Sequence, residues 1–178
     1  WNKNSRWYAK ITQGEGHFCH QTVIIPKTLT LFGLKPGDKI LDLACGSGFF
    51  ARELAKTGAK LIGVDGSAKL IELARRHGPE VTYHISLAER LPFLADHSLD
   101  QALLVLALQN LAPVKAVLAE LHRALKPDGR LHLVLNHPAF RVPRGSSWAY
   151  DEVARQQYRR LDYYLSERRV EIAMHPGQ

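Results

Sequence analysis

The segment from Ile40 to Phe49 constrains the fold of this chain more than any other. It reads ILDLACGSGF, an apolar run with an acidic residue near its end, followed by a turn through Gly46 and Gly48. Glycine tolerates positive φ, and its missing Cβ lets a ligand come close to the backbone. A second apolar run ends at Asp65, nineteen residues after Gly46. At that place in a βαβ unit an acidic side chain points into the binding crevice and can hold a ribose diol, so the pattern predicts a nucleoside site.

Short apolar runs alternate with amphipathic stretches from residue 39 onward. This alternation predicts an α/β fold, a doubly wound and mainly parallel sheet of the Rossmann-like kind. Pro26 is expected to begin a short helix that reaches Phe32, and Ser67 is expected to cap a helix that buries Leu70, Ile71 and Ala74. The expected strands are 39–43, 61–65, 81–85, 102–106 and 130–135, the last entered by a turn at 126–129; the expected core helices are 48–57, 67–77 and one opened by Pro113 with Val114, Leu118, Leu121 and Leu125 on one stripe.

The glycine-rich turn leaves two kinds of ligand open by spacing alone. Ala51 completes a Gly-x-Gly-x-x-Ala pattern, so the spacing permits a dinucleotide seated on a helix N-terminus. Asp42 argues against it, because a carboxylate beside the turn would repel a doubly charged pyrophosphate and attract a cationic group. The residues therefore favour a nucleoside without phosphates.

Five motifs in order across residues 36–136 make the chain similar to a known family. The sequence resembles the class I S-adenosylmethionine-dependent methyltransferases, in the small-molecule branch that includes quinone and sterol enzymes. The segments that carry the resemblance are Asp42-Leu-Ala-Cys-Gly-Ser-Gly48, Gly63-Val-Asp65-Gly-Ser67, Ala88-Glu89-Arg90-Leu91-Pro92-Phe93, Leu99-Asp100 through Leu106, and Leu125-Lys126-Pro127-Asp128-Gly129-Arg130-Leu131.

The resemblance implies S-adenosyl-L-methionine as cofactor and S-adenosyl-L-homocysteine as product. Asp42 would orient the amino group of the ligand, Asp65 would bind the ribose hydroxyls, and the Ala88 backbone would contact the adenine. Leu108 and Gln109 would lie close to the sulfonium. The full set implied for the cofactor is Asp42, Ala44, Cys45, Gly46, Gly48, Asp65, Gly66, Ser67, Leu87, Ala88, Glu89, Leu108 and Gln109.

Two positions depart from the family pattern. Ala44 stands where the family often has a glycine, a change expected to cost little room. Leu87 stands where the family usually has an acidic residue that accepts a hydrogen bond from the adenine amino group. Either Glu89 or a backbone carbonyl replaces that acceptor, or cofactor affinity is lower by about 1 kcal/mol. Alternatively, Leu87 is simply a buried aliphatic side chain at a strand end.

Methyl transfer to a hydroxyl or a carbon acid needs a base, and histidine is the usual one. His137 follows the fifth expected strand at the ligand-binding edge of the sheet, and His20 lies in the N-terminal segment. His175 is a third and more distant candidate, and an ordinary surface histidine is the plainer alternative for each. No His, Cys, Asp or Glu cluster has metal-ligand spacing.

The flanks are expected to cover the core. Residues 1–30 are interpreted as an N-terminal lid or substrate segment, 31–136 as the cofactor-binding core, and 137–178 as a helical lid. Val170, Ile172 and Met174 alternate like a short strand, and an amphipathic helix is expected from the helical spacing of Tyr150, Val153, Ala154, Gln157, Tyr158, Leu161 and Tyr164. Only five strands are expected by Asn136 whereas the family has seven, so the chain is expected to be cut short after Gln178.

Two other functions remain open from the sequence. The net charge of +7 and the arginines at 155, 159 and 160 are compatible with an RNA methyltransferase. The change at Leu87 is compatible with a non-catalytic binding or assembly module. A small-molecule acceptor is favoured over nucleic acid, and a homodimer is possible. The longest aliphatic run has seven residues, too short for a membrane span, and two cysteines suggest the cytoplasm.

Overall fold

The computed structural model describes residues 18–137, 145–167 and 170 of the chain. The chain divides into two compact units, Trp1–Val134 and Leu135–Gln178. No helix in this described part has the length and apolar character that crossing a membrane requires.

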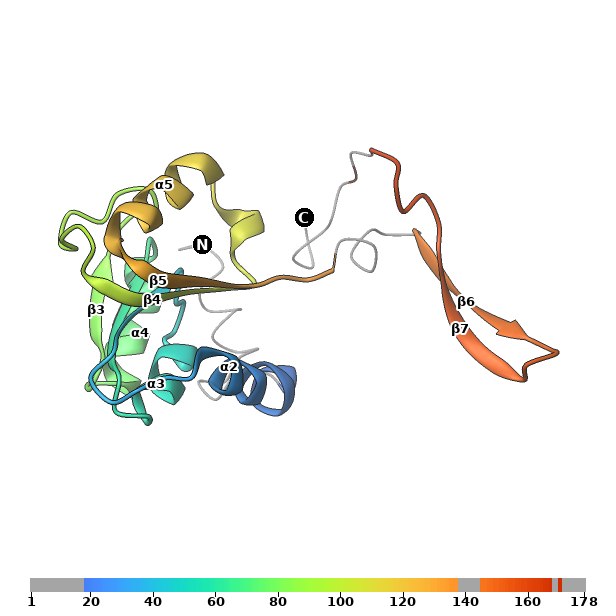
Figure 1. Cartoon of the computed structure of the whole chain (residues 1–178), viewed down its shortest axis with the longest axis horizontal. Helices are drawn as coiled ribbons and strands as arrows, with labels where there is room; N and C mark the ends of the chain where they lie inside the picture. Colours follow the sequence, from blue (N-terminus) through green and yellow to red (C-terminus); the bar gives the residue numbers. More distant parts are fainter. Residues whose placement is uncertain (1–17, 138–144, 168–169, 171–178) are drawn as a thin grey trace. The chain divides into compact units, whose positions relative to one another are not determined.

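The first unit is built on a five-stranded parallel sheet (Figure 1). Its strands lie in the order β3-β2-β1-β4-β5, which confirms the predicted doubly wound fold. Strand β5 pairs with β4 at Leu125 and again at Arg130, while β4 advances only from Leu99 to Gln101. The turn expected at residues 126–129 therefore loops out within β5. The strand bounds are β1 Lys39–Leu43, β2 Lys60–Asp65, β3 Thr82–Ile85, β4 Leu99–Val105 and β5 Leu125–Val134.

Helices cover both faces of the sheet (Figure 1). Helices α2, α3 and α4 pack on one face in a cluster with Ile40, Leu61 and Leu103. Helix α5 packs on the other face, against a cluster that includes Leu41 and Leu104. The helix bounds are π-helix η1 His20–Ile24, α2 Ile25–Phe32, α3 Phe49–Ala55, α4 Ala68–His77, the 3₁₀ turn η2 Leu108–Asn110 and α5 Val114–Ala124.

The helix predictions hold in outline, with one correction. The Ser67 hydroxyl accepts a hydrogen bond from the Leu70 amide at 3.4 Å, which confirms the predicted cap of α4. Helix α5 buries Val117, Leu121 and Ala124. The stripe expected through Val114 and Leu118 was wrong in part, because these side chains stay 38% and 39% exposed on the flank of the helix.

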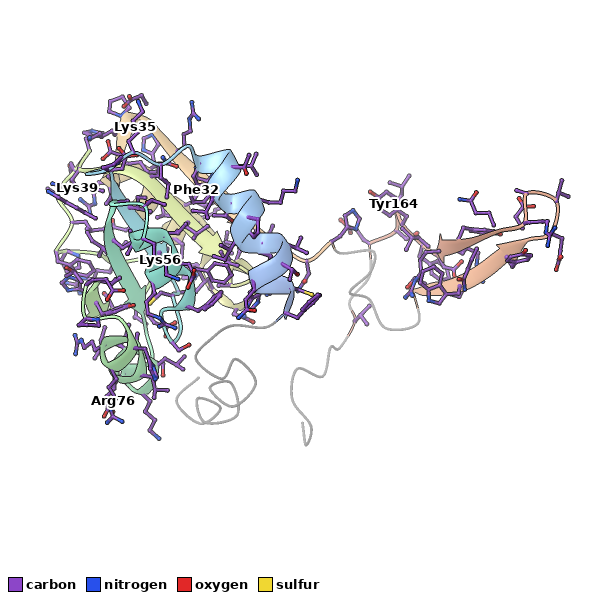
Figure 2. The ribbon with its side chains drawn as sticks, turned by 90° about the horizontal axis from the view of Figure 1, so that it is seen from below. Phe32, Lys35, Lys39, Lys56, Arg76 and Tyr164 are labelled. Carbon is purple, nitrogen blue, oxygen red and sulfur yellow. The ribbon has the colours of Figure 1, made fainter. Side chains whose placement is uncertain are left out.

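Helix α2 is joined to the sheet by one polar and one aromatic contact. The Phe32 ring lies 3.6 Å from the His132 ring, between centroids, and the Phe32 carbonyl accepts from the Gln101 side chain at 3.1 Å. Figure 2 shows Phe32 between α2 and the sheet, and Arg76 at the outer edge of the first unit. These contacts place the segment that contains His20 next to the core.

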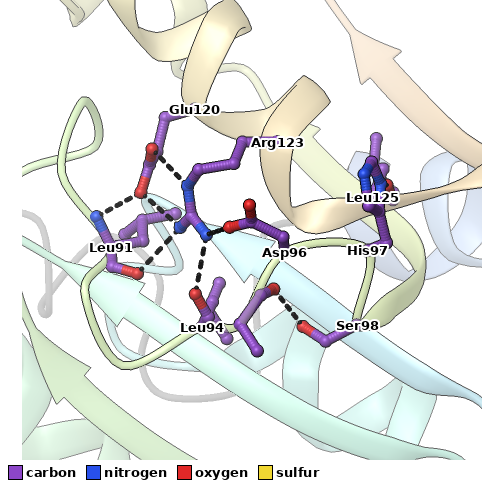
Figure 3. A network of polar contacts seen from close by, with 9 residues as sticks. Leu91, Leu94, Asp96, His97, Ser98, Glu120, Arg123 and Leu125 are labelled. Carbon is purple, nitrogen blue, oxygen red and sulfur yellow. Dashed lines mark hydrogen bonds and ion pairs between the residues drawn. The ribbon is translucent and has the colours of Figure 1, made fainter.

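A polar network attaches α5 to the loop that follows β3 (Figure 3). The Glu120 carboxylate accepts from the Leu91 amide at 2.7 Å and pairs with Arg123 at 2.8 Å. Arg123 also donates to the carbonyls of Leu91 and Leu94 and pairs with Asp96. The loop that begins with the predicted adenine-binding residues is therefore fixed at its far end.

The second unit contains a β-hairpin, so the helix expected between Tyr150 and Tyr164 was wrong. Strand β6 (Ser146–Asp151) pairs antiparallel with β7 (Gln156–Leu161). The Asp151 carboxylate accepts from the amides of Val153 and Ala154, both at 2.9 Å, and so favours a turn where a helix would continue. The strand expected across 170–174 lies outside the described residues apart from Val170.

Candidate cofactor site

The site forms at the carboxyl ends of β1 and β2, where parallel sheets bind ligands. The Asp65 carboxylate accepts from the Gly46 amide at 3.0 Å with one oxygen and from the Ser67 amide at 2.8 Å with the other. The Cys45 amide donates to the Val64 carbonyl at 2.9 Å. Asp65 thus joins the glycine-rich loop after β1 to the start of α4.

The loop backbone turns through left-handed conformations at three residues. Gly46 has φ +57° and Gly48 has φ +77°, both accessible to glycine without strain. Ala44 has φ +57° as well, where an L-residue with a Cβ is disfavoured by about 1–2 kcal/mol. Alanine in place of glycine at position 44 was expected to be unfavourable only through its small extra volume. That expectation is incomplete, because the unfavourable contribution comes from strain in the backbone.

Asp42 is a buried acid at the centre of the site. Its side chain is 2% exposed, and its Oδ2 has no hydrogen-bond partner among the described residues. Burial raises the pKa of Asp42 to about 7; the Ala51 backbone amide lowers it, and neighbouring Asp65 raises it again. A buried carboxylate oxygen without a partner is costly, and a cationic ligand group would satisfy it.

Asp65 and Cys45 respond differently to their surroundings. Burial raises the pKa of Asp65, but the amides of Ser67 and Gly46 counter that effect by bonding to the charged form. Burial and the two nearby carboxyl groups raise the pKa of the Cys45 thiol well above its usual value. Cys45 is therefore a small packing residue and not a reactive thiolate.

The residues predicted for the adenine follow β3. Ala88 is buried, Glu89 is half-buried and Leu87 is 64% exposed. The alternative of Leu87 as a buried core residue was wrong. A Cβ placed on Gly66 would lie 3.9 Å from Leu87 Cδ2, so Leu87 reaches the loop after β2. Leu87 and Gly66 therefore lie next to each other on the surface where the adenine is predicted to bind.

The residues predicted for the sulfonium end follow β4. Leu108 and Gln109 begin the short η2 turn, with Leu108 half-buried and Gln109 exposed. The Gln109 side chain donates to the Leu106 carbonyl at 2.6 Å. Leu106 itself has φ +51°. A strained non-glycine backbone beside a site is a common feature of functional loops.

The two histidines predicted as bases lie in different units of the chain. The His20 ring lies 6.0 Å from the Phe49 ring and 5.2 Å from the Phe50 ring, at the start of α3 directly after the loop. His137 is exposed in the second unit and stacks on Tyr164 at 6.1 Å. His175 lies outside the described residues. Both catalytic assignments therefore stay predictions.

Two further residues support the loop and were not selected from the sequence. The Arg52 guanidinium donates to the Ser47 carbonyl at 2.7 Å, and Tyr83 packs beneath Gly48. Arginine on a helix surface and tyrosine in a strand carry no sequence signal of such a role. Within the described residues no group of three or more His, Cys, Asp or Glu side chains could hold a metal ion.

These features define a class of protein: an α/β domain whose loop and two aspartates suit a nucleoside with a cationic tail. S-adenosylmethionine fits the residues present. Its ammonium group would pair with Asp42 Oδ2, which has no hydrogen-bond partner among the described residues, and its ribose hydroxyls would donate to Asp65. Gly46 and Gly48 have positive φ and no Cβ, so the methionine portion can come close to the backbone of the loop.

Comparisons with known proteins agree with this class. The sequence profile of a family described as "Methyltransferase domain" matches residues 41–133, more than half of the chain. The demethylmenaquinone methyltransferase of Beutenbergia cavernae is 36% identical over 104 residues, 58% of this chain and 43% of that one. The 2-phytyl-1,4-naphtoquinone methyltransferase of a Nostoc species is 36% identical over 114 residues, 59% of this chain and 49% of that one.

A solved structure shows the same fold. The S-adenosylmethionine-dependent methyltransferase of Mesorhizobium loti superposes with a TM-score of 0.67 and 30% identity, over 82% of this chain and 68% of that one. The chain belongs to the methyltransferase domain family, in its S-adenosylmethionine-dependent, class I form. S-adenosylmethionine is the cofactor of this family. The chain spans about half the length of the curated relatives it matches.

Proposed function

We propose that this protein transfers the methyl group of S-adenosylmethionine to a small organic acceptor. The observation that carries the proposal is the pair of aspartates. Asp65 holds the loop in place through Gly46, and Asp42 has a buried oxygen to which no described residue is hydrogen-bonded. The family match across residues 41–133 supports the same function.

The residues of the chain mainly bind and orient in this proposal. The bound cofactor supplies a methyl group already activated by the positive sulfur, so alignment of the acceptor with the S–CH3 bond is the main requirement. Asp42 receives the ammonium group and Asp65 the ribose hydroxyls. Gly46 and Gly48 pass beneath the methionine portion, and Gly66, Leu87 and Ala88 surround the adenine.

A quinone-like acceptor is the first substrate class to test. Two relatives are named as methyltransferases of demethylmenaquinone and of 2-phytyl-1,4-naphtoquinone. We propose reduced naphthoquinones as candidate acceptors on this basis. His20 or His137 would then remove the proton that the acceptor loses, and the segments 1–30 and 137–178 would exclude water from the reaction.

Calorimetry with S-adenosylmethionine tests the cofactor half of the proposal. We expect saturable binding to the folded protein, and the absence of heat and of a thermal shift at millimolar ligand would refute it. Incubation with labelled cofactor and a metabolite extract tests the transfer half. Formation of S-adenosylhomocysteine together with a labelled small molecule is expected, whereas binding without turnover would favour a non-catalytic module.

The proposal also covers partners and location. We propose a cytoplasmic protein that acts on a small molecule and can form a homodimer. RNA remains the second candidate acceptor because of the net charge of +7. RNA affinity that falls steeply with salt would favour it, since phosphate contacts release counterions.

A further inference from the structure

A row of three residues crosses the sheet beneath the cofactor site. Asp42 of β1 pairs with Gly63 of β2, and Gly63 pairs with Tyr83 of β3. Side chains at paired positions of neighbouring strands point to the same face of a sheet. Asp42 and Tyr83 therefore project from the same face, separated by a residue without a side chain.

Three glycines leave the space that the Tyr83 side chain fills. A Cβ placed on Gly63 would lie 2.5 Å from Tyr83 Cδ1, and one on Gly48 would lie 2.3 Å from the Tyr83 hydroxyl oxygen. A Cβ on Gly78 would lie 3.0 Å from the same oxygen. These glycines come from β2, the glycine-rich loop and the end of α4. One 5% exposed tyrosine thus contacts three separate segments.

The position of Tyr83 is itself fixed from two sides. Its strand pairs with β2, and its backbone carbonyl accepts from the Arg75 guanidinium of α4 at 2.8 Å. The ring is therefore a rigid support, and Gly48 rests on it at the point where α3 begins. Close-packed interiors transmit such contacts because few voids are left to absorb a shift.

We propose that Tyr83 is a positioning residue of the cofactor site. Its ring supports the loop 44–48 from the sheet side and keeps the Gly46 amide within reach of Asp65. A smaller side chain leaves a cavity under Gly48, and the loop then samples positions in which the Gly46–Asp65 hydrogen bond is broken. The inference rests on the proposed function in one respect, that this loop binds S-adenosylmethionine.

The first test compares two Tyr83 variants with a matched core variant. Calorimetry with S-adenosylmethionine and S-adenosylhomocysteine gives the dissociation constants. We expect Tyr83→Leu to weaken binding tenfold or more. Tyr83→Phe keeps the ring against Gly63 and Gly48 but loses the hydroxyl that lies against Gly48 and Gly78, so it should weaken binding at least threefold less than Tyr83→Leu does. Leu121→Ala, a buried change within α5 on the other face of the sheet, should stay within threefold of the wild type although it destabilises the fold. Equal binding by Tyr83→Leu, or an equal loss in Leu121→Ala, overturns the inference.

A double-mutant cycle tests the contact between Gly63 and the Tyr83 ring, and its wild-type and Tyr83→Phe arms do not depend on how well Tyr83→Leu folds. Gly63→Ala places a methyl group 2.5 Å from Tyr83 Cδ1 and 3.1 Å from Cys45 Sγ, so we expect tenfold weaker binding in the wild-type background, most of it through the closer contact with the ring. In the Tyr83→Phe background the ring is still present and the loss should be the same. In the Tyr83→Leu background the loss should fall below threefold. The same factor in all three backgrounds would show that Gly63 does not act through the ring.

Hydrogen exchange separates this inference from the proposed function. In the protein without cofactor, Tyr83→Leu should speed exchange of the Gly46 amide tenfold or more relative to amides of β4, and Leu121→Ala should not. Unchanged exchange at Gly46 overturns the positioning role even if the site binds. Failure of the wild type to bind S-adenosylmethionine refutes the proposed function alone, because the exchange result still decides the role of Tyr83.

Discussion

The Asp65 carboxylate accepts a hydrogen bond from the Gly46 backbone amide at 3.0 Å, across nineteen residues of sequence. One side chain thus fixes the loop after β1 and also stands at the place where a ribose would bind. Because the other Asp65 oxygen accepts from Ser67, the same carboxylate links the loop to the helix that follows β2. Asp65 therefore fixes the geometry of the loop and is also the residue that we propose for ribose binding.

Replacement of Asp65 tests this double role. The Asp65 carboxylate accepts from two backbone amides, one on each oxygen. Asp65→Asn replaces one of these oxygens by an NH2 group, which cannot accept, and it also removes the negative charge. Hydrogen bonds to charged groups contribute about 1.5–3 kcal/mol, so we expect cofactor affinity to fall at least tenfold by calorimetry. Glu72→Gln on the exposed side of α4 is the control and should bind like the wild type. Wild-type affinity in Asp65→Asn would contradict the assignment.

Because its pKa is raised on folding, Asp42 makes the free energy of unfolding fall as pH rises, the opposite of the usual effect of an acidic residue. Its pKa in the folded protein is raised to about 7 from an ordinary value of 3.8. Between these values the folded state holds the proton and the unfolded state has lost it. The free energy of unfolding therefore decreases from about pH 4 to pH 7 and is level above that, because the state that binds more protons is favoured by acid.

Denaturant unfolding of Asp42→Asn and the wild type at pH 5 and pH 8 measures this contribution. Asn cannot ionise, so the variant should gain stability relative to the wild type as pH rises. Each pH unit in the window contributes about 1.4 kcal/mol at most, and a few kcal/mol is the upper bound. Subtraction of the two proteins cancels the histidines. A stability difference that is constant with pH would show that Asp42 is ionised in the folded state throughout.

Ala44 offers a stabilising substitution. Its φ of +57° is unfavourable for alanine and favourable for glycine, so Ala44→Gly should raise the free energy of unfolding by about 1 kcal/mol and Tm by a few degrees. Ala51→Gly, inside α3, is the matched control and should lower stability by about 1 kcal/mol or more. Loss of stability in Ala44→Gly would mean that its methyl group packs more favourably than its backbone is strained.

Replacement of Leu87 by an acidic residue should raise the affinity for the cofactor product. Its side chain is 64% exposed, so Leu87→Asp introduces a carboxylate without burying it. An acceptor for the adenine amino group should tighten S-adenosylhomocysteine binding about fivefold, the effect of about 1 kcal/mol. An analogue with hypoxanthine in place of adenine lacks that amino group and should show no gain. An equal change for both ligands would place Leu87 away from the adenine.

The cofactor loop could be predicted from sequence because its signal is local. Gly46, Gly48 and Asp65 stand out by residue type and spacing, and the strands that lead to them are short apolar runs with clear turn signals. The structure shows the predicted turn, whereas the cofactor roles of these residues stay predictions. The hairpin β6–β7 could not be predicted in this way, because Tyr150 and Tyr158 satisfy a helical period as well as a strand. The antiparallel pairing of residues 146–151 with residues 156–161 settles this segment as a hairpin, and the Asp151 side chain bonds to the amides of the turn between them.

The parallel α/β sheet, the order of its motifs and the acidic residues proposed for the site could all be read from the sequence. These follow from periodicity, turn chemistry and spacing along one stretch of chain. Only the tertiary structure shows that Asp42 is buried with one oxygen unpaired within the described part of the chain, that Leu87 is exposed, and that Tyr83 lies under Gly48. Each of these depends on which strands are neighbours and in what register, since residues far apart in sequence meet only once the sheet has formed.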